Sequence, residues 1–202
     1  STGRPKGVAV QHGSLVSYVI HTNQLLALNS NDVVLYSTAL TFDASVQLVW
    51  CPLARSARLV LTKPTAMLDV AYTADLLGRQ QVSFVDLVPS VLTLYLDVMA
   101  DELGGVCFSN VKQVFVLGEA CRPSLAARMT EPQFQLKFFN RYGPAEATIA
   151  SHGFECASTD VHQGESVPIG APLPNVSCLI QSSTEEALPV RVPAELLLGG
   201  IQ

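Results

Sequence analysis

Val82-Ser83-Phe84-Val85-Asp86 is a short apolar segment rich in β-branched and aromatic residues, and so is Lys112-Gln113-Val114-Phe115-Val116-Leu117. Such segments favour strands. Between them, residues 90–99 carry apolar side chains at helical spacing, and Pro89 stands just ahead, where proline is tolerated in a first helical turn. A strand, a helix and a strand in this order predict a β-α-β unit, whose two strands lie parallel in one sheet.

The same alternation extends outward from this unit. Further strands are predicted at residues 32–36, 57–61 and 135–139, and further helices at residues 13–28, 45–53, 66–77 and 124–129. After about residue 150 only short strands are expected, at 177–180 and 195–198, among loops rich in Pro, Gly, Ser and Thr. We therefore predict an α/β fold: a mostly parallel sheet with helices over about residues 1–150, followed by a smaller β-rich part over about 151–202. Ligand sites in such sheets form at the carboxyl ends of the strands.

The composition excludes several classes of protein. Of the 202 residues, 49% are apolar and 14% are charged, against roughly 25% charged in an average globular protein, which excludes a disordered chain. The net charge of −5 lacks the basic footprint of a general nucleic-acid binder. No stretch approaches the roughly 18 unbroken apolar residues of a membrane span. We expect neither nucleic acid nor membrane as a partner.

The cysteines predict the compartment. Five are present, at positions Cys51, Cys107, Cys121, Cys156 and Cys178. Their number is odd and no two are closely spaced, so neither a metal site nor a disulfide framework is indicated. We expect each to be a small buried apolar residue in a reducing compartment, and the location to be cytoplasmic.

Both ends have the character of internal sequence. The chain opens on Ser1-Thr2-Gly3 without an initiator Met, and it closes on Leu198-Gly199-Gly200-Ile201-Gln202, a strand that runs into a glycine turn. We expect a fragment of a longer protein. Such a fragment alone would be inactive and marginally stable, because truncation exposes apolar sheet faces and sheet edges.

The first candidate site is the opening segment, Ser1-Thr2-Gly3-Arg4-Pro5-Lys6-Gly7. Small hydroxyl and glycine residues leave backbone N–H groups open to phosphate oxygens, and Lys6 adds a positive charge. This is not a Walker A loop, because the lysine precedes the glycine and the strand-like Val8-Ala9-Val10 follows. The alternative is an ordinary solvated turn.

Two further candidates follow predicted elements. In Asn140-Arg141-Tyr142-Gly143-Pro144-Ala145-Glu146, Tyr142 could stack on a base and Glu146 could hold a divalent metal on a triphosphate, unless the segment is a tight turn with a solvated glutamate. The segment Phe42-Asp43-Ala44-Ser45 has two interpretations. Either Asp43 or Ser45 caps the helix that follows, or the Asp43 carboxylate lies in a pocket and binds an ammonium group.

Taken together, S-T-G-x-P-K-G, F-D-A-S, N-x-Y-G-P-x-E and A-E-L occur in one order along the whole chain. This combination resembles the adenylation domains of nonribosomal peptide synthetases, which belong to the adenylate-forming, AMP-binding superfamily together with acyl-CoA ligases and luciferases. The resemblance implies that residues 1–202 are part of such a domain's large N-terminal subdomain. The C-terminal subdomain, with its adenylation lysine, lies outside the sequence.

The resemblance also implies roles for individual residues. Those implied in ATP binding are Thr2, Gly3, Lys6, Gly118, Glu119, Ala120, Asn140 and Tyr142. Lys6 and Glu146 are implied as catalytic, with Glu146 as the ligand of Mg²⁺. The family's usual threonine before this glutamate is Ala145 here, and the glycine before Glu195 is Ala194, so two positions depart from the pattern.

The substrate pocket is implied in the same way, with Asp43 pairing with the α-ammonium group of an amino acid. The implied lining consists of Asp43, Ala44, Gln47, Asp86, Phe115, Leu117, Arg141, Ile149 and Ala150. Buried polar groups need partners, so Asp86 and Arg141 either pair with each other or address the substrate separately. Phe115 and Leu117 are expected to shorten the pocket. A polar substrate side chain, such as that of glutamine or glutamate, is favoured.

The implied reaction is ATP-dependent activation of an amino acid to an aminoacyl adenylate. Loading onto the phosphopantetheine of a carrier domain would follow, next to a condensation domain, in the biosynthesis of a secondary metabolite. One alternative is an acyl- or aryl-acid ligase, which does not need the Asp43 carboxylate. The other is a non-catalytic remnant of the fold, which Ala145 favours.

Overall fold

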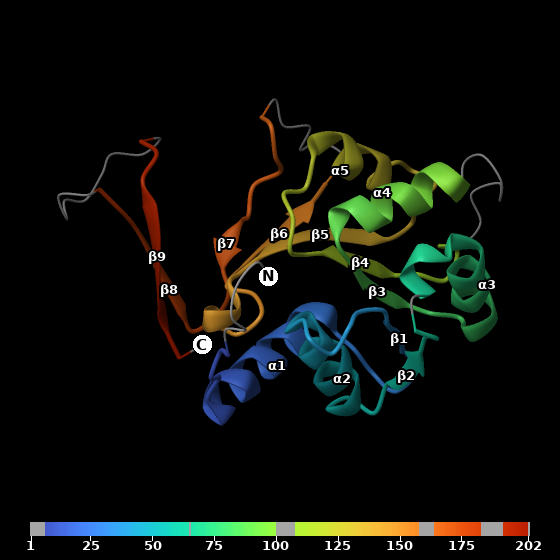
Figure 1. The fold of residues 1–202 in the computed structure, drawn as a ribbon, viewed down its shortest axis with the longest axis horizontal. Helices are drawn as coiled ribbons and strands as arrows, with labels where there is room; N and C mark the ends of the chain where they lie inside the picture. Colours follow the sequence, from blue (N-terminus) through green and yellow to red (C-terminus); the bar gives the residue numbers. More distant parts are fainter. Residues whose placement is uncertain (1–6, 65, 100–107, 158–163, 183–191, 202) are drawn as a thin grey trace.

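A seven-stranded sheet forms the centre of the computed structural model, which describes residues 7–64, 66–99, 108–157, 164–182 and 192–201 (Figure 1). The strand order is β2-β1-β3-β4-β5-β6-β7. The strands are β1 (Val33–Tyr36), β2 (Arg58–Leu61), β3 (Phe84–Leu87), β4 (Gln113–Val116), β5 (Lys137–Tyr142), β6 (His152–Cys156) and β7 (Ala171–Pro172). Strands β1 to β5 run parallel to one another, whereas β6 pairs antiparallel with β5, and β7 pairs antiparallel with β6.

Helices cover both faces of this sheet. They are α1 (His12–Leu26), α2 (Ala44–Leu53), α3 (Val70–Gln80), α4 (Pro89–Val98) and α5 (Pro123–Met129), with short 3-10 turns η1 (Ala66–Leu68) and η3 (Ala145–Ala147). Figure 1 shows α1 and α2 on one face and α3, α4 and α5 on the other. The predicted fold class is therefore confirmed: a mixed α/β chain with a mostly parallel sheet.

Side chains of the central parallel strands alternate between two buried cores, as the pleat requires. Val85 and Leu87 of β3 belong to the core on the side of α3 and α4. Phe84 belongs to the core on the side of α1 and α2, together with Phe115 and Phe139 of the next two parallel strands. Because side chains two residues apart share a face, Asp86 and Arg141 are placed on the α1 and α2 side as well.

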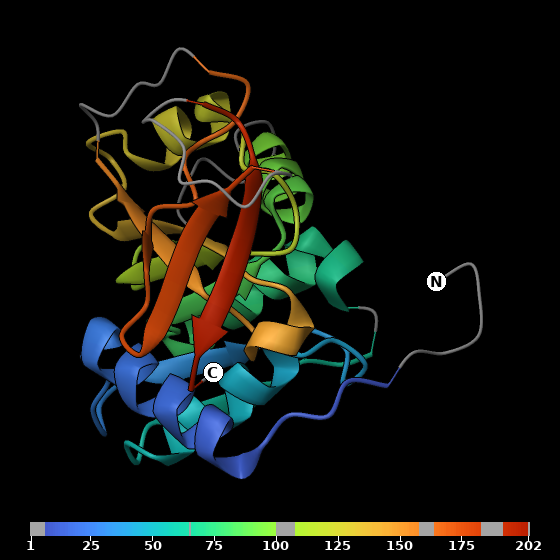
Figure 2. The same ribbon diagram turned by 90° about the vertical axis from the view of Figure 1, so that its left-hand side faces the viewer.

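The β-rich part ends in a separate two-stranded antiparallel sheet, made of β8 (Val176–Gln181) and β9 (Glu195–Gly200). Figure 2 shows this pair in front of the large sheet. The Ile201 N–H donates to the Asn175 carbonyl (3.2 Å) and so continues the pairing of the two strands by one residue. The Ser14 hydroxyl of α1 donates to the Ile201 carbonyl (2.6 Å) and ties this end to the rest of the chain.

The predicted strands and helices agree with the structure to within a few residues at most of their boundaries, with two exceptions in type. The strands β6 and β7 are not predicted. The expected strand character of Val8-Ala9-Val10 is wrong, since residues 7–11 form neither strand nor helix, and Val8 and Val10 are exposed. These valines have no sheet partner within the described residues, so their β-branched character alone does not make a strand.

The cysteines follow the prediction at three positions. Cys51, Cys121 and Cys156 are free and buried, and burial raises the pKa of the Cys51 thiol to about 12. Cys178 corrects the prediction, because it lies exposed on β8, in the sheet that stands apart from the main core. Cys107 lies outside the described residues, as do the predicted phosphate-loop residues Thr2, Gly3 and Lys6.

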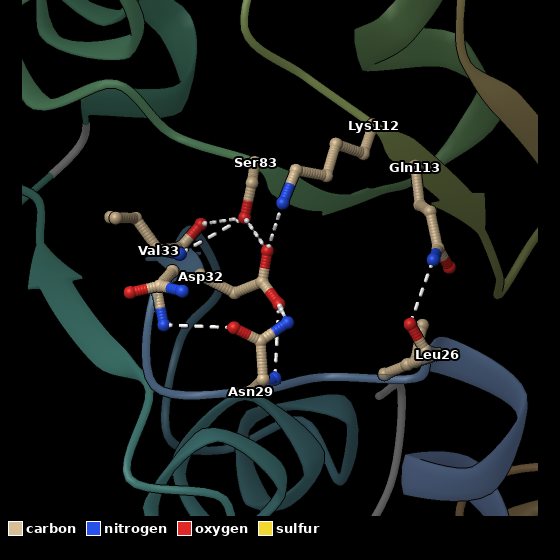
Figure 3. A network of polar contacts seen from close by, with 8 residues as sticks. Leu26, Asn29, Asp32, Val33, Ser83, Lys112 and Gln113 are labelled. Carbon is tan, nitrogen blue, oxygen red and sulfur yellow. Dashed lines mark hydrogen bonds and ion pairs between the residues drawn. The ribbon is translucent and has the colours of Figure 1, made fainter.

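A polar network ties the strands together at their amino ends (Figure 3). Asp32, directly before β1, is buried and accepts hydrogen bonds from the Ser83 hydroxyl (3.0 Å), from the Lys112 ammonium group (2.7 Å), and from the backbone N–H and side-chain amide of Asn29 (3.0 and 2.8 Å). Burial alone would raise the pKa of Asp32, but these hydrogen bonds outweigh it and hold the pKa below its ordinary value. The network therefore fixes the start of three neighbouring strands.

Candidate functional site

A cavity of 490 Å³ opens at the carboxyl ends of the parallel strands, at the end of the sheet opposite the Asp32 network. The segment after β1 contributes Ser37, Thr38 and Ala39 to its wall. The remaining lining residues are Phe42, Asp43, Ala44, Leu48, Met67, Asp86, Leu87, Val88, Val91, Leu117, Gly118, Glu119, Gly143 and Ile149. Residues that are far apart in sequence meet here because parallel strands all end at the same edge.

Asp43 caps a helix and also lies in the wall of the cavity. It is the N-cap of α2, and its carboxylate accepts a hydrogen bond from the Ala44 N–H (2.9 Å). It also lines the cavity and is only half-buried. Burial raises the pKa of Asp43, and the negative charge of Glu146 raises it further. A cation in the cavity would relieve both effects, so this carboxylate is suited to a positively charged group.

Gln47 of α2 joins Asp86 and Arg141, the two charged residues considered as a pair from the sequence. Its side-chain N–H₂ donates to Asp86 Oδ2 (2.7 Å), and its carbonyl accepts from Arg141 Nη1 (3.1 Å) and from the Tyr18 hydroxyl. All four residues are buried. Within the part of the chain that the structure describes, Asp86 and Arg141 form no direct ion pair; the amide of Gln47 stands between them.

The Arg141 guanidinium lies between two aromatic rings. Its central carbon is 5.3 Å from the centroid of Tyr18 and 5.1 Å from that of Phe115, distances suited to cation–π attraction. Its Nε and Nη2 atoms are buried and have no hydrogen-bond partner among the described residues. The positive charge is therefore held by the rings, by Gln47 and by the nearby Asp86 carboxylate.

The pKa of Asp86 reflects this environment. Burial raises it to about 7, although the Arg141 charge and the Gln47 hydrogen bond both lower it. Burial also raises the pKa of Tyr18 far above its ordinary value, so its hydroxyl keeps its proton and remains a donor at neutral pH. The network thus contains one fixed donor, one fixed cation and one carboxyl group that titrates near neutrality.

The turn after β5 brings the backbone very close to itself. A Cβ atom on Gly143 would lie 2.5 Å from the Ala150 Cα, so only glycine fits there. Thr148 and Ile149 both have positive φ values, of 57° and 73°. This conformation is strained for β-branched residues and is often found at functional sites. Ile149 contributes to the wall of the cavity in this conformation.

The described residues implied in nucleotide binding are not all gathered in this cavity. Gly118 and Glu119 line it, and the Glu119 carboxylate also accepts from the N–H and hydroxyl of Ser90, at the start of α4 (3.0 and 2.9 Å). Ala120 lines a neighbouring cavity that Glu119 shares. Glu119 is therefore held in place at the boundary of two cavities.

Asn140 and Tyr142, on β5, have other neighbours. The Asn140 side-chain amide is buried and donates to the carbonyls of Val167 (3.3 Å) and Pro168 (2.9 Å). The ring of Tyr142 is 40% exposed and packs edge-on against His152. Neither side chain lines the 490 Å³ cavity, and the exposure of Tyr142 leaves it accessible to a flat partner outside that cavity.

Glu146 lies in the exposed turn η3, near enough to Asp43 for its charge to raise the pKa of that residue. Among the described residues, no group of three or more His, Cys, Asp or Glu side chains could hold a metal ion. A single exposed carboxylate is still compatible with Mg²⁺, which keeps several waters and is commonly held by one or two carboxylates together with substrate phosphates.

Five of the nine residues implied in substrate binding line the cavity: Asp43, Ala44, Asp86, Leu117 and Ile149. The other four, Gln47, Phe115, Arg141 and Ala150, are buried and are not part of its wall. Phe115 packs edge-on against Phe84 and Phe139, so Leu117 alone of the two bulky residues shortens the cavity. Tyr18 is not among the predicted residues, because a tyrosine at an apolar position of a helix is indistinguishable from core.

The comparisons with known proteins agree with this architecture. The family model described as AMP-binding enzyme matches residues 1–202. The chain therefore belongs to the AMP-binding enzyme family. It is 35% identical over 200 residues to tyrocidine synthase 3 of Brevibacillus parabrevis, covering 99% of this chain and 3% of that protein. It is 36% identical over 202 residues to phosphinothricin tripeptide synthetase PhsB of Streptomyces viridochromogenes, covering 100% of this chain and 16% of that protein.

Solved structures show the same fold. The nonribosomal peptide synthetase FmoA3 in its α-methyl-L-serine-AMP bound form matches 98% of this chain and 22% of its own, with a TM-score of 0.90 and 27% identity. The Vibrio cholerae adenylation domain AlmE in complex with glycyl-adenosine-5'-phosphate matches 100% of this chain and 38% of its own, with a TM-score of 0.86 and 28% identity. The chain thus spans only a minor part of each of these relatives.

In the described part of the chain, none of the helices combines the length and the apolar character that crossing a membrane requires.

Proposed function

We propose that the protein containing this chain activates an amino acid with ATP, forming an aminoacyl adenylate that is then loaded onto a carrier domain. The observation that carries the proposal is the position of Asp43 in the wall of a cavity that Gly118, Glu119 and Gly143 also line. A half-buried carboxylate with a raised pKa suits an α-ammonium group, and the glycine-bordered side of the same cavity suits the nucleotide. Relatives solved in complex with aminoacyl adenylates support the assignment.

In this reaction an oxygen of the amino-acid carboxylate attacks the α-phosphorus of ATP. The bond between that phosphorus and the oxygen bridging to the β-phosphate breaks, and pyrophosphate leaves with the electron pair. Such a step depends on positioning and on neutralising charge. Asp43 would hold the ammonium group, and the accessible ring of Tyr142 together with the Gly118 turn would hold the adenine.

Lys6 and Glu146 complete the proposal as the residues assigned to the phosphates by the family resemblance. Glu146 would hold Mg²⁺, which supplies positive charge to the triphosphate when bound. Residues 1–202 are the proposed part of an adenylation domain's N-terminal subdomain that contains this site. Condensation and carrier domains are the proposed neighbours.

The test is amino-acid-dependent exchange of labelled pyrophosphate into ATP by the full-length protein. Exchange with one or a few amino acids supports the proposal. Exchange only with acyl or aryl acids would assign the protein to that other class of ligase, and ATP binding without any exchange would assign it to the non-catalytic class.

A second measurement tests the metal assignment. Glu146→Gln should lower the exchange rate substantially, with a partial recovery at higher Mg²⁺ concentration. Glu155→Gln is the matched control, because Glu155 is an exposed β6 residue whose ion-pair partner is Lys137 (3.2 Å). An exchange rate in Glu146→Gln equal to that of the control would remove Glu146 from the proposed site.

A further inference from the structure

The orientation of the Gln47 amide is determined by its neighbours. Its carbonyl oxygen faces the Arg141 guanidinium, which can only donate, and it also accepts from the Tyr18 hydroxyl, whose proton is retained. Rotating the amide by half a turn would set its N–H₂ group against the Arg141 guanidinium and its carbonyl oxygen against the Asp86 carboxylate. The N–H₂ group therefore faces Asp86, as observed at 2.7 Å.

This orientation assigns different roles to the two oxygens of Asp86. Oδ2 accepts the hydrogen bond from the Gln47 N–H₂ group. Oδ1 has no hydrogen-bond partner among the described residues, and Asp86 lines the cavity whereas Gln47 does not. Oδ1 is thus the oxygen available to a group inside the cavity. Asp86 is 6% exposed, so a ligand in the cavity can donate to Oδ1 in place of water.

The charges around Asp86 restrict the ligand further. Asp86 and Arg141 have opposite charges and are both buried, so the cluster is close to neutral when Asp86 is ionised. A cationic side chain would add an unbalanced charge, and an anionic one would face the Asp86 carboxylate. Met67, Leu117 and Ile149 line the cavity with apolar surface, which suits the stem of a side chain but not a second charge.

Resting on the proposed function, we propose that the activated amino acid has an uncharged side chain with a hydrogen-bond donor, which Asp86 accepts. Amide, hydroxyl and indole side chains are uncharged side chains of this kind. The proposal also includes Tyr18, as a positioning residue that acts through the Gln47 amide. Tyr18 never touches the substrate; it fixes the direction of the amide, and the amide fixes which oxygen of Asp86 is free.

The first test compares amino acids by pyrophosphate exchange with the full-length protein. The amino acid with the highest kcat/KM is expected to carry an uncharged donor. Its kcat/KM should exceed that of a similarly sized amino acid without the donor by roughly 10- to 100-fold. If glutamine is the best substrate, for example, glutamate is the analogue for this comparison. A best substrate with an aliphatic, acidic or basic side chain would overturn the inference while leaving the proposed function intact. Absence of exchange with every amino acid would instead refute the proposed function.

Asp86→Asn provides a sharper test. Gln47 still needs an acceptor for its N–H₂ group, so the new amide turns its oxygen to Gln47 and its own N–H₂ group to the cavity. The subsite then donates, and the preference for glutamine-like over glutamate-like side chains is expected to fall by at least tenfold. Asp97→Asn is the matched control, because Asp97 pairs with Arg128 on the surface (2.6 Å). An unchanged preference in folded Asp86→Asn would overturn the assignment.

Tyr18→Phe tests the positioning role and does not depend on Asp86→Asn folding. It removes one of the two donors that hold the Gln47 carbonyl, so KM for the donor-bearing amino acid should rise severalfold, with kcat and KM for ATP nearly unchanged. Tyr36→Phe is the control, since the Tyr36 hydroxyl is buried without a hydrogen-bond partner among the described residues. The positioning role would be refuted if Tyr18→Phe and Tyr36→Phe raised KM equally. It would also be refuted if Tyr18→Phe raised KM equally for all amino acids, and Tyr18 would then be a packing residue.

Discussion

Asp43 combines a helix cap with a proposed ammonium site, and two substitutions separate these roles. Asn is a good N-cap, so Asp43→Asn keeps the hydrogen bond with the Ala44 N–H (2.9 Å) and removes only the charge. Asp43→Ala removes both. We expect both variants to lose amino-acid activation to a similar extent, and only Asp43→Ala to lose stability.

The structure sets the size of each effect. Loss of the cap costs about 1 kcal/mol of unfolding free energy. An ion pair at about 4 Å in a partly buried site, at an effective dielectric constant near 20, is worth about 4 kcal/mol. Asp43 is only half-buried and its carboxylate keeps one hydrogen bond, so solvent screening lowers this value to about 2–3 kcal/mol. The expected increase in KM for the amino acid is therefore roughly 30- to 150-fold.

The assay is pyrophosphate exchange with the amino acid varied and ATP saturating, together with thermal unfolding of each variant in the full-length protein. KM for ATP should change little, because the lost charge addresses the amino acid. Full activity in Asp43→Asn with reduced stability in Asp43→Ala would refute the reasoning, since Asp43 would then be a helix cap alone.

Three further outcomes are expected. Gly143→Ala should destabilise the protein by about 1–3 kcal/mol because its Cβ would lie 2.5 Å from the Ala150 Cα, whereas Gly78→Ala, in open space within α3, should stabilise it by up to about 1 kcal/mol in thermal unfolding. Asp32→Ala should cost about 2 kcal/mol in denaturant unfolding at neutral pH, because several donors lose their buried acceptor. Since the pKa of Asp32 is lowered on folding, this difference should disappear as the pH falls from about 4 through the lowered pKa. The kcat/KM for a donor-bearing amino acid should rise through about pH 7 as Asp86 loses its proton, and this rise should be absent in Asp86→Asn pH profiles.

Much of the fold follows from local sequence patterns. Strongly apolar segments such as Val114 to Leu117, separated by helical spacing, specify parallel strands with helices between them. The strand β6 has no such pattern, because His152 to Cys156 mixes polar residues with a glycine and is stabilised by pairing with β5 and β7. Its strand character comes from tertiary neighbours rather than from its own composition.

The site is only partly predictable for a related reason. The family resemblance identifies Asp43 and Asp86, which the structure brings into one cavity wall, but it says nothing of Tyr18. A tyrosine among the apolar residues of a helix gives no sign of where its hydroxyl points. Only the packing of α1 against α2 and the sheet shows that this hydroxyl reaches Gln47.

The relation between Asp86 and Arg141 shows why residue type alone is insufficient. Two opposite charges on one sheet face suggest a direct ion pair, in which both oxygens of the carboxylate would be occupied by the guanidinium. Gln47 instead takes one oxygen of Asp86 and one nitrogen of Arg141, so each charge is compensated while the second oxygen stays open to the cavity. A direct pair would close the subsite, whereas the bridged arrangement keeps an acceptor for a substrate. The neutral amide between the charges is therefore what converts a structural pair into a candidate specificity element.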